Sequence, residues 1–354
     1  MTRILAINPG ATSTKYGVFE GETVLLKNAV EHQGSELHQF ERVFDQYHYR
    51  LELITAGLAE AEISLDSLDG VVGRGGLLKP LLGGTYGVNP VMVEDLKKAE
   101  RGEHASNLGA VMAYDLAQKL GIPAFIVDPV SVDEMVPEAR LSGMPDLPRV
   151  CMCHTLNSKA VARKVAKEMG KQYDELNFVV AHLGSGISIS PHRKGRLIDV
   201  NNAKEEGPFS PDRCGGLPAM MLTKLCFSGK YTQNEVLTKI MGSGGMYAYL
   251  GTKDIREAEK RAANGDKDAE LVLEAMCYQI AKEIGAMSVV LAGDVDGIIL
   301  TGGIAYSQRI VDGISRRVKF IAPVVVVPGE EELESLAQGA IRVLQREEQA
   351  NTYQ

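Results

Sequence analysis

Two short turns rich in glycine and hydroxyl residues have the composition of phosphate-binding loops. Residues 8–15 read Asn-Pro-Gly-Ala-Thr-Ser-Thr-Lys, and residues 182–186 read His-Leu-Gly-Ser-Gly. Such a turn presents backbone N–H groups to an anion, because glycine lets the backbone approach and serine or threonine adds short donors. A plain hairpin turn would use the same residues, so neither turn alone decides between the two interpretations. Their repetition, with a later glycine pair at Gly302 and Gly303, favours phosphate binding.

Two arginines and one aspartate have the side-chain types that phosphoryl transfer requires. Arg74 and Arg213 lie among glycines and turn formers, which suits a guanidinium that stabilises negative charge at a site. A surface ion pair is the alternative for each. Asp128 follows the apolar run at residues 124–127, at the carboxyl end of an expected strand, where catalytic acids of α/β folds are common. Its alternative role is to cap the turn before Pro129.

Two histidines lie beside these features. His154 directly follows Cys151, Met152 and Cys153, so a zinc corner is one interpretation. No second pair of ligands stands at zinc spacing, which argues against it. His182 ends an expected buried strand at the second turn, where a structural role and a phosphate contact are both open.

Asn8 and Glu331 carry side-chain oxygens of the kind that bind Mg²⁺, and they are the ligands expected if the chain binds a metal–nucleotide, as the family resemblance described below implies. Mg²⁺ accepts few carboxylates and keeps several waters, so two or three oxygen ligands from the protein are enough. Glu332 is close behind Glu331 as a candidate, within the acidic run at residues 330–332. An acidic helix N-terminus is the alternative interpretation of this run.

The elements that must position these residues alternate between strand-like and helical patterns, which predicts an α/β architecture. Helices are expected over 107–120 and 158–169, and an apolar stripe runs through 268–291. The strand–turn–strand pattern of residues 4–19 returns at 178–190. This repetition predicts two related domains facing each other across a cleft. We expect the first at 1–136 with a C-terminal helix at about 333–354, and the second at 137–332.

Composition limits the classes of protein to consider. The 354 residues are 45% hydrophobic and 24% charged, as in ordinary globular proteins, and the net charge is −8. This charge gives no reason to expect nucleic acid or a membrane as a partner. The five cysteines and the absence of a secretory signal predict a cytoplasmic protein with reduced thiols. The sequence has no Walker loop, no dinucleotide fingerprint and no protein-kinase motif pair.

The motifs, taken in order, resemble those of the acetate and butyrate kinases, the acetokinase family. This family belongs to the superfamily of actin, sugar kinases and heat-shock ATPases. The resemblance runs from residue 4 to about residue 340. It rests on these segments: Asn8 to Lys15 as the first signature, His182 to Gly186 as the second phosphate loop, Asp212 to Gly215 as the catalytic arginine motif, Asp254 to Arg256 as the adenosine contact, Leu300 to Ile304 as the loop under the adenosine, and Glu330 to Leu333 as the acidic turn.

The resemblance implies two ribonuclease-H-like, actin-like ATPase domains flanking a nucleotide cleft, in a homodimer or higher homo-oligomer. The implied reaction is reversible in-line phosphoryl transfer between ATP and a short-chain carboxylate, butanoate before acetate or isobutyrate, giving the acyl phosphate and ADP with Mg²⁺. A hydroxyl-directed sugar kinase and a non-catalytic ATP-dependent conformational protein are the alternatives. The residues implied as catalytic are Arg74, His154, Arg213 and Asp128. Those implied to bind the nucleotide are Asn8, Ser13, Lys15, His182, Gly184, Ser185, Gly186, Asp254, Arg256, Gly302 and Gly303.

The sequence departs from the acetate kinases in ways that bear on the acid. Those enzymes carry Arg-Val-Val-His-Gly-Gly where this chain has residues 71–76, so Arg74 is assigned by function, three places along. Gly73 and Cys153 stand where acetate kinases have the valine and phenylalanine of the methyl pocket. Smaller walls leave room for methylenes, each worth about 0.8 kcal/mol when buried. The implied preference is therefore for a four-carbon acid.

Overall fold

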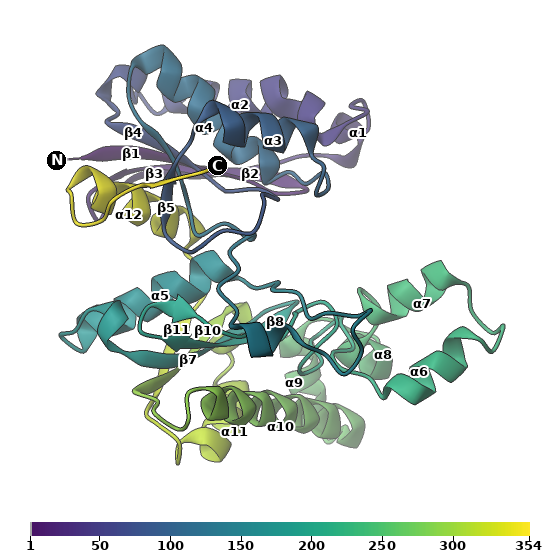
Figure 1. Cartoon of the computed structure of the whole chain (residues 1–354). Helices are drawn as coiled ribbons and strands as arrows, with labels where there is room; N and C mark the ends of the chain where they lie inside the picture. The colour runs from purple at the N-terminus through teal and green to yellow at the C-terminus, as the bar shows by residue number, and fades with distance from the viewer. Residues whose placement is uncertain (1) are drawn as a thin grey trace. The chain divides into compact units, whose positions relative to one another are not determined.

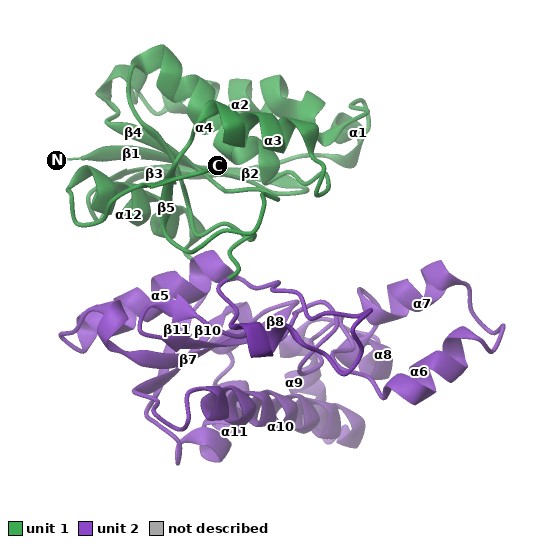
Figure 2. Ribbon diagram, in the orientation of Figure 1, with its two compact units in different colours: residues 1–133, 331–354 green, residues 134–330 purple. Residues whose placement is uncertain are grey.

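The computed structural model describes residues 2–354, which divide into two compact units. Unit 1 comprises Met1–Asp133 and Glu331–Gln354, and unit 2 comprises Glu134–Glu330 (Figures 1 and 2). Within residues 2–354, none of the helices combines the length and the apolar composition that crossing a membrane requires.

Unit 1 contains a sheet of seven strands in the order β12-β5-β6-β4-β1-β2-β3. β1, β2 and β3 are successive antiparallel neighbours, and β4 and β6 add in parallel beside β1. The strands are β1 Arg3–Pro9, β2 Ser13–Glu20, β3 Thr23–Glu31, β4 Gly70–Gly73, β5 Thr85–Gly87, β6 Ala124–Val127 and β12 Asn351–Thr352. The helices are α1 Gly34–Leu37, α2 Tyr47–Glu60, α3 Pro90–Lys98, α4 Asn107–Leu120 and α12 Glu332–Leu344. Figure 1 shows α2, α3 and α4 over one face of the sheet and α12 over the other.

Unit 2 contains a sheet of five strands in the order β11-β10-β7-β8-β9. The strands are β7 Asn177–Leu183, β8 Ile187–Arg193, β9 Arg196–Leu197, β10 Gly297–Gly302 and β11 Val324–Pro328. The helices are α5 Thr155–Glu168, α6 Ala219–Cys226, α7 Gln233–Ile240, α8 Gly245–Leu250, α9 Ile255–Ala263, α10 Lys267–Val290 and α11 Gln308–Val318.

Alternating side chains of β7 bury the two faces of this sheet against different helices. Phe178 and Val180 pack with Val161 and Val165 of α5. Val179, Ala181 and Leu183 pack with α10 and α11 in the largest core cluster. Both faces of the strand are therefore apolar, as expected for a strand covered on both sides.

The two sheets share one plan. Each sheet contains an antiparallel meander of three strands followed by two parallel strands. In unit 1 the order is β3-β2-β1-β4-β6, and in unit 2 it is β9-β8-β7-β10-β11. The two glycine turns occupy the same place in this plan, between the first and second strand of each meander. The prediction of two related α/β domains is therefore confirmed.

Candidate functional site

The first glycine turn closes on itself between β1 and β2. The N–H of Gly10 donates to the carbonyl oxygen of Ser13 at 2.7 Å. Ala11 and Thr12 at its tip are exposed, and so is Lys15, the third residue of β2, while Ser13 is half-buried. The turn thus presents backbone and a lysine to solvent, which suits an anion.

The acid that the structure brings to this turn is Glu332, the first residue of α12. Its Oε2 accepts a hydrogen bond of 2.6 Å from Nδ2 of Asn8, and its Oε1 pairs with the guanidinium of Arg74. The Arg74 and Glu332 side chains are 19% and 21% exposed, so this is a half-buried pair rather than a surface one. Glu331, the predicted metal ligand, is the exposed N-cap residue of the helix. The structure therefore groups Asn8 and Arg74 with Glu332 and leaves Glu331 outside this group.

Asp128 ends β6 with its side chain almost fully buried, at 1% exposure, and with a positive φ of 37°. Its Oδ1 accepts from the N–H of Gly84 at 2.7 Å, and its own N–H donates to the carbonyl of Gly84 at 3.1 Å. The carboxylate therefore holds the segment before β5 against the end of β6. This contact explains why the residue is an aspartate, and its part in catalysis stays a prediction.

The predicted acyl-pocket residues both have packing roles. A Cβ at Gly73 would lie 2.0 Å from the carbonyl oxygen of Gly109, so the absent side chain lets β4 touch α4. Cys153 is buried in an apolar cluster with Met135 and Leu197, and burial raises the pKa of its thiol. Close packing thus accounts for both small residues without an acyl chain.

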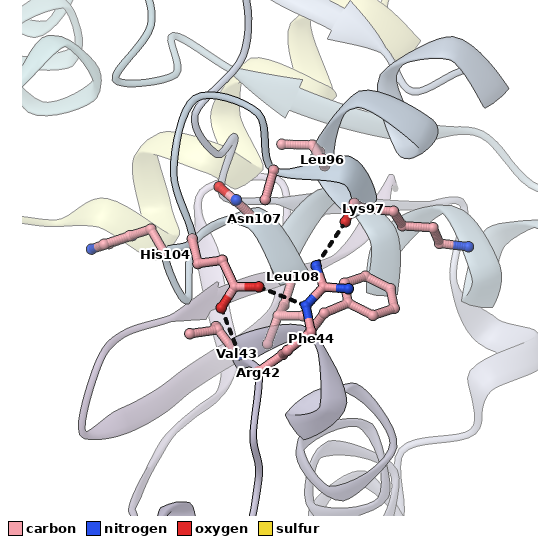
Figure 3. Close-up of a pocket in the computed structure, with 10 residues that line it drawn as sticks. Arg42, Val43, Phe44, Leu96, Lys97, His104, Asn107 and Leu108 are labelled. Carbon is pink, nitrogen blue, oxygen red and sulfur yellow. Dashed lines mark hydrogen bonds and ion pairs between the residues drawn. The ribbon is translucent and has the colours of Figure 1, made fainter.

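A cavity lies beside the segment at residues 102–107. Its volume of about 10 Å³ is enough for about one water molecule. Glu103, His104 and Asn107 line it with Arg42 and Phe44 (Figure 3). The Arg42 Nε donates to Glu103 Oε1 at 2.8 Å across it. This space is too small for a four-carbon acid.

The second glycine turn lies between β7 and β8, directly beneath the guanidinium of Arg213. The N–H of Gly184 donates to the carbonyl oxygen of Gly186 at 3.2 Å. A Cβ at Gly186 would lie 2.4 Å from Nη1 of Arg213, so only glycine lets the guanidinium pack on this backbone. The same Nη1 donates to the carbonyl of Ala203 at 2.9 Å. The predicted arginine and the predicted turn are therefore in contact.

Ser210 ties the arginine segment to the turn. Its Oγ accepts from the backbone N–H of Arg213 at 3.1 Å and donates to the carbonyl of Ser185. Sequence reasoning missed Ser210 and Ala203, since both act through contacts that only the folded chain creates.

The two predicted histidines stack on each other. The rings of His154 and His182 have centroids 3.8 Å apart and planes 10° from parallel. Nδ1 of His154 lies 3.0 Å from Oγ of Ser188. Nδ1 of His182 lies 2.8 Å from Oδ1 of Asn157, and because an amide oxygen only accepts, this contact assigns a proton to Nδ1. The other ring nitrogen, Nε2 of His182, faces the carboxylate of Glu330.

Asn157 holds together the loops at the carboxyl end of the unit 2 sheet. Besides His182, its Oδ1 accepts from Oγ1 of Thr301 at 3.3 Å, and its Nδ2 donates to the carbonyl of Gly329 at 3.4 Å. Nε2 of His182 lies 3.0 Å from Oε1 of Glu330, at angles that do not make a hydrogen bond. Sequence reasoning missed Asn157. It lies three residues after His154, the N-cap residue of α5, and this short spacing is the signal that would have found it.

The predicted adenosine segment forms the N-terminus of α9. Asp254 is its N-cap residue and accepts from the N–H of Arg256 at 2.9 Å, and the two side chains form an ion pair of 2.7 Å. The hydrogen bonds from Arg256 lower the pKa of Asp254 to about 2. Gly302 pairs its backbone with Gly329, and Gly303 is exposed with open space where a Cβ would lie. Contact with adenosine stays a prediction for these four residues.

Within residues 2–354, no group of three or more His, Cys, Asp and Glu side chains is arranged to hold a metal ion. Cys153, which belongs to the zinc corner considered from the sequence, has its Sγ 3.7 Å from Oγ of Ser188. A magnesium site would therefore depend on few protein oxygens, and Asn8 with Glu332 is the amide and carboxylate pair that fits.

The repeated sheet plan and the glycine turns define an actin-like ATPase fold. Solved structures of the same architecture include the acetate kinase of Porphyromonas gingivalis, with a TM-score of 0.79 and 20% identity over 97% of this chain and 100% of that one. The propionate kinase of Francisella tularensis gives a TM-score of 0.73 and 18% identity over 96% and 99% of the two chains.

The sequence identifies the family within this fold. The profile of the acetokinase family matches residues 149–327. The chain is 51% identical to Butyrate kinase 1 of Clostridium acetobutylicum over 354 residues, the full length of both. The chain belongs to the acetokinase family and is a carboxylate kinase, a phosphotransferase.

Proposed function

We propose that this protein is a butyrate kinase, which transfers the γ-phosphoryl group of ATP to butanoate and reverses the reaction readily. The full-length identity of 51% to a butyrate kinase supports butanoate as the acid. The observation that supports phosphoryl transfer is the Arg213 guanidinium packed on the Gly186 backbone of a glycine turn.

The nucleophile needs no general base, because a carboxylate with a pKa of about 4 is ionised at neutral pH. One butanoate oxygen bonds to the γ-phosphorus while the bond to the β,γ-bridging oxygen breaks, and that electron pair leaves with ADP. Both reactants are anions, so catalysis depends on positioning and on cations that offset the charge of the transferring group.

Two arginines and a histidine are proposed to supply the cations and donors. Arg213 would stabilise the equatorial oxygens of the phosphoryl group, and Arg74 would hold the carboxylate or the phosphoryl group beside Asn8. His154 would donate a hydrogen bond to the transferring group. Asp128 would organise the metal and the first turn.

Nucleotide binding is assigned to the two turns and to the α9 region. Backbone N–H groups of the turns would hold phosphate oxygens, and the residues proposed for this are Asn8, Ser13, Lys15, His182, Gly184, Ser185 and Gly186. Asp254, Arg256, Gly302 and Gly303 are proposed to contact the adenosine. Asn8 and Glu332 would hold Mg²⁺, which when bound offsets charge on the β- and γ-phosphates.

The preferred acid is tested by a turnover series over acids of two to six carbons, with hydroxylamine trapping of the product. An acyl phosphate gives a hydroxamate, whereas a sugar phosphate or simple ATP hydrolysis does not. We expect butanoate to give the highest kcat/KM and acetate to be poorer by about tenfold or more, since buried methylenes discriminate modestly. Preference for acetate would contradict the butanoate assignment, and ATP turnover without hydroxamate would contradict carboxylate transfer.

The protein is also proposed to form a homodimer or higher homo-oligomer through the α6–α7 surface. α6 has no buried residue, and Met220, Met221, Phe227 and Leu237 on this surface are all exposed, Phe227 by 87%. Figure 1 shows both helices projecting beyond the sheet of unit 2. A large exposed apolar surface marks a protein–protein interface, and we assign this interface to a second copy of the same chain, since most soluble oligomers are homo-oligomers.

Sedimentation measures the oligomer directly. Phe227→Glu with Met220→Glu is expected to shift the protein to a smaller species. Phe320→Glu is the control, because Phe320 is 83% exposed in the same unit but follows α11 in the chain and is part of neither α6 nor α7. A wild-type monomer at micromolar concentration, or an equal shift in the control, would contradict this surface.

A further inference from the structure

A completely buried arginine lies against the first glycine turn. Arg50, on α2, is 0% exposed. Its Nη1 donates to the carbonyl of Gly10 at 3.0 Å, to the carbonyl of Ser13 at 3.1 Å and to Oγ1 of Thr14 at 2.8 Å. Its Nε and Nη2 both donate to Oε1 of Gln46, at 3.1 and 2.8 Å. The guanidinium therefore binds three acceptors within the turn and one on Gln46, the residue that precedes α2.

The guanidinium of Arg50 makes no direct ion pair with a carboxylate of the described residues. Every acceptor around it is a neutral oxygen. Burial lowers its pKa from the usual value, which reflects the cost of the charge in this position. An isolated buried charge is expensive, so a protein that needed only hydrogen bonds here would gain by using a neutral side chain.

The residues around the turn form one oriented chain of hydrogen bonds. Because Thr14 Oγ1 accepts from Arg50, its own hydrogen is directed to Nε2 of His32, 2.8 Å away. Nδ1 of His32 then donates to the hydroxyl of Tyr49 at 3.2 Å. Burial, followed by the charge of Arg50, lowers the pKa of His32, which agrees with a neutral ring. The N–H of His32 also donates to the carbonyl of Thr12 at 2.8 Å. The carbonyl oxygens of Gly10 and Ser13 therefore accept from Arg50, and that of Thr12 accepts from His32.

We propose that Arg50 is a positioning residue for nucleotide phosphate: it fixes the conformation of the Gly10–Thr14 turn and places beneath it a permanent charge that the bound phosphate compensates. This proposal rests on the proposed function, since it assigns the anion to ATP or ADP. The carbonyls of the turn are bonded to Arg50 and His32, and the Gly10 N–H is bonded to Ser13, so the backbone that the turn offers to phosphate is that of its exposed residues Ala11 and Thr12. The buried charge is weakly screened.

Two substitutions separate the charge from the hydrogen bonds. Arg50→Gln keeps hydrogen-bonding capacity and removes the charge, whereas Arg50→Lys keeps the charge and loses the planar fork. Arg42→Gln is the matched control, because it removes the same charge from an exposed side chain near the start of α2 that pairs with Glu103. For each variant, the dissociation constant of Mg·ADP is measured by calorimetry, and KM for ATP and butanoate and kcat are measured in the hydroxamate assay.

We expect Arg50→Gln to raise the dissociation constant of ADP and the KM for ATP by about tenfold or more, with the KM for butanoate changed by less than about threefold. Arg50→Lys should stay within about threefold of wild type in ADP affinity. A merely structural role would lower the melting temperature of both variants and leave ADP affinity unchanged in the folded fraction, which overturns the proposal. Should Arg50→Gln not fold, a tenfold loss of ADP affinity in folded Arg50→Lys also overturns it. Wild-type protein that binds ADP but makes no hydroxamate refutes the proposed function instead.

Discussion

Replacing Arg213 by alanine is expected to lower kcat by about 10²–10⁴-fold while ADP affinity changes only a few-fold. The reason is that its guanidinium lies on the Gly186 backbone, where negative charge on the transferring phosphoryl group would develop. An interaction that strengthens in the transition state contributes to kcat rather than to ground-state binding. Steady-state kinetics and calorimetry with Mg·ADP measure the two quantities separately.

Arg316→Ala is the control for Arg213→Ala. Arg316 carries the same charge in the same unit but is exposed and pairs with Glu274 of α10. Its kcat should stay within about twofold of wild type, as for most surface substitutions. An Arg213→Ala protein that keeps more than about a tenth of the wild-type kcat would refute the catalytic assignment of this arginine.

The repeated sheet plan was predictable because its signals are local. Each domain contains two successive apolar strands joined by a glycine turn, and both the strand period and the turn residues are readable in a short window. The helix at Asn107–Leu120 was predicted with the same bounds that the structure shows. Helix α5 was predicted to begin at Ser158, but it begins at Thr155. Ser158 has the type of an N-cap, yet it is fully buried inside the helix, where its N–H donates to the carbonyl of His154.

The contacts that support the site could not be predicted from the sequence. Arg50 reads as an ordinary helical arginine, because nothing near it in the chain shows that its partners are carbonyls of residues 10 and 13. Ser210 and Ala203 hold Arg213 through the folded loops. Motifs locate the residues that face the ligand, since their types are set by chemistry. The side chains behind them are set by tertiary packing, which short windows do not contain.

The small residues Gly73 and Cys153 show a different limit of sequence reasoning, and their place in an acyl pocket stays a prediction. Both were assigned to an acyl pocket because their positions correspond to larger pocket residues in acetate kinases. In the structure Gly73 allows contact with Gly109, and Cys153 fills an apolar cluster. A small side chain is equally a sign of close packing, so the preference for butanoate rests on the full-length relationship and on the acid series that tests it.

Glu332→Gln is expected to lower kcat/KM by about 10²–10³-fold, whereas Glu331→Gln should change it by less than about threefold. Sequence reasoning favoured Glu331, since successive acidic residues at the start of a helix are equivalent in type. They are not equivalent in direction, because each residue turns about 100° around the helix axis. Only Glu332 reaches both Nδ2 of Asn8 and the guanidinium of Arg74.

Substitution by glutamine keeps the size of the side chain and removes its charge, so the Glu332→Gln variant tests the carboxylate rather than the packing. Arg74 would lose its ion pair, and the one remaining amide oxygen could accept from Asn8 or from Arg74 but no longer offer a separate oxygen to each. The Mg²⁺ concentration for half-maximal activity should also rise, because one of the few proposed oxygen ligands becomes neutral. Kinetics at varied Mg²⁺, with melting temperatures of both variants to exclude unfolding, measure these effects. If Glu331→Gln shows the larger loss and the higher Mg²⁺ requirement, the metal role returns to Glu331, and the Asn8–Glu332–Arg74 group is a structural contact of unit 1.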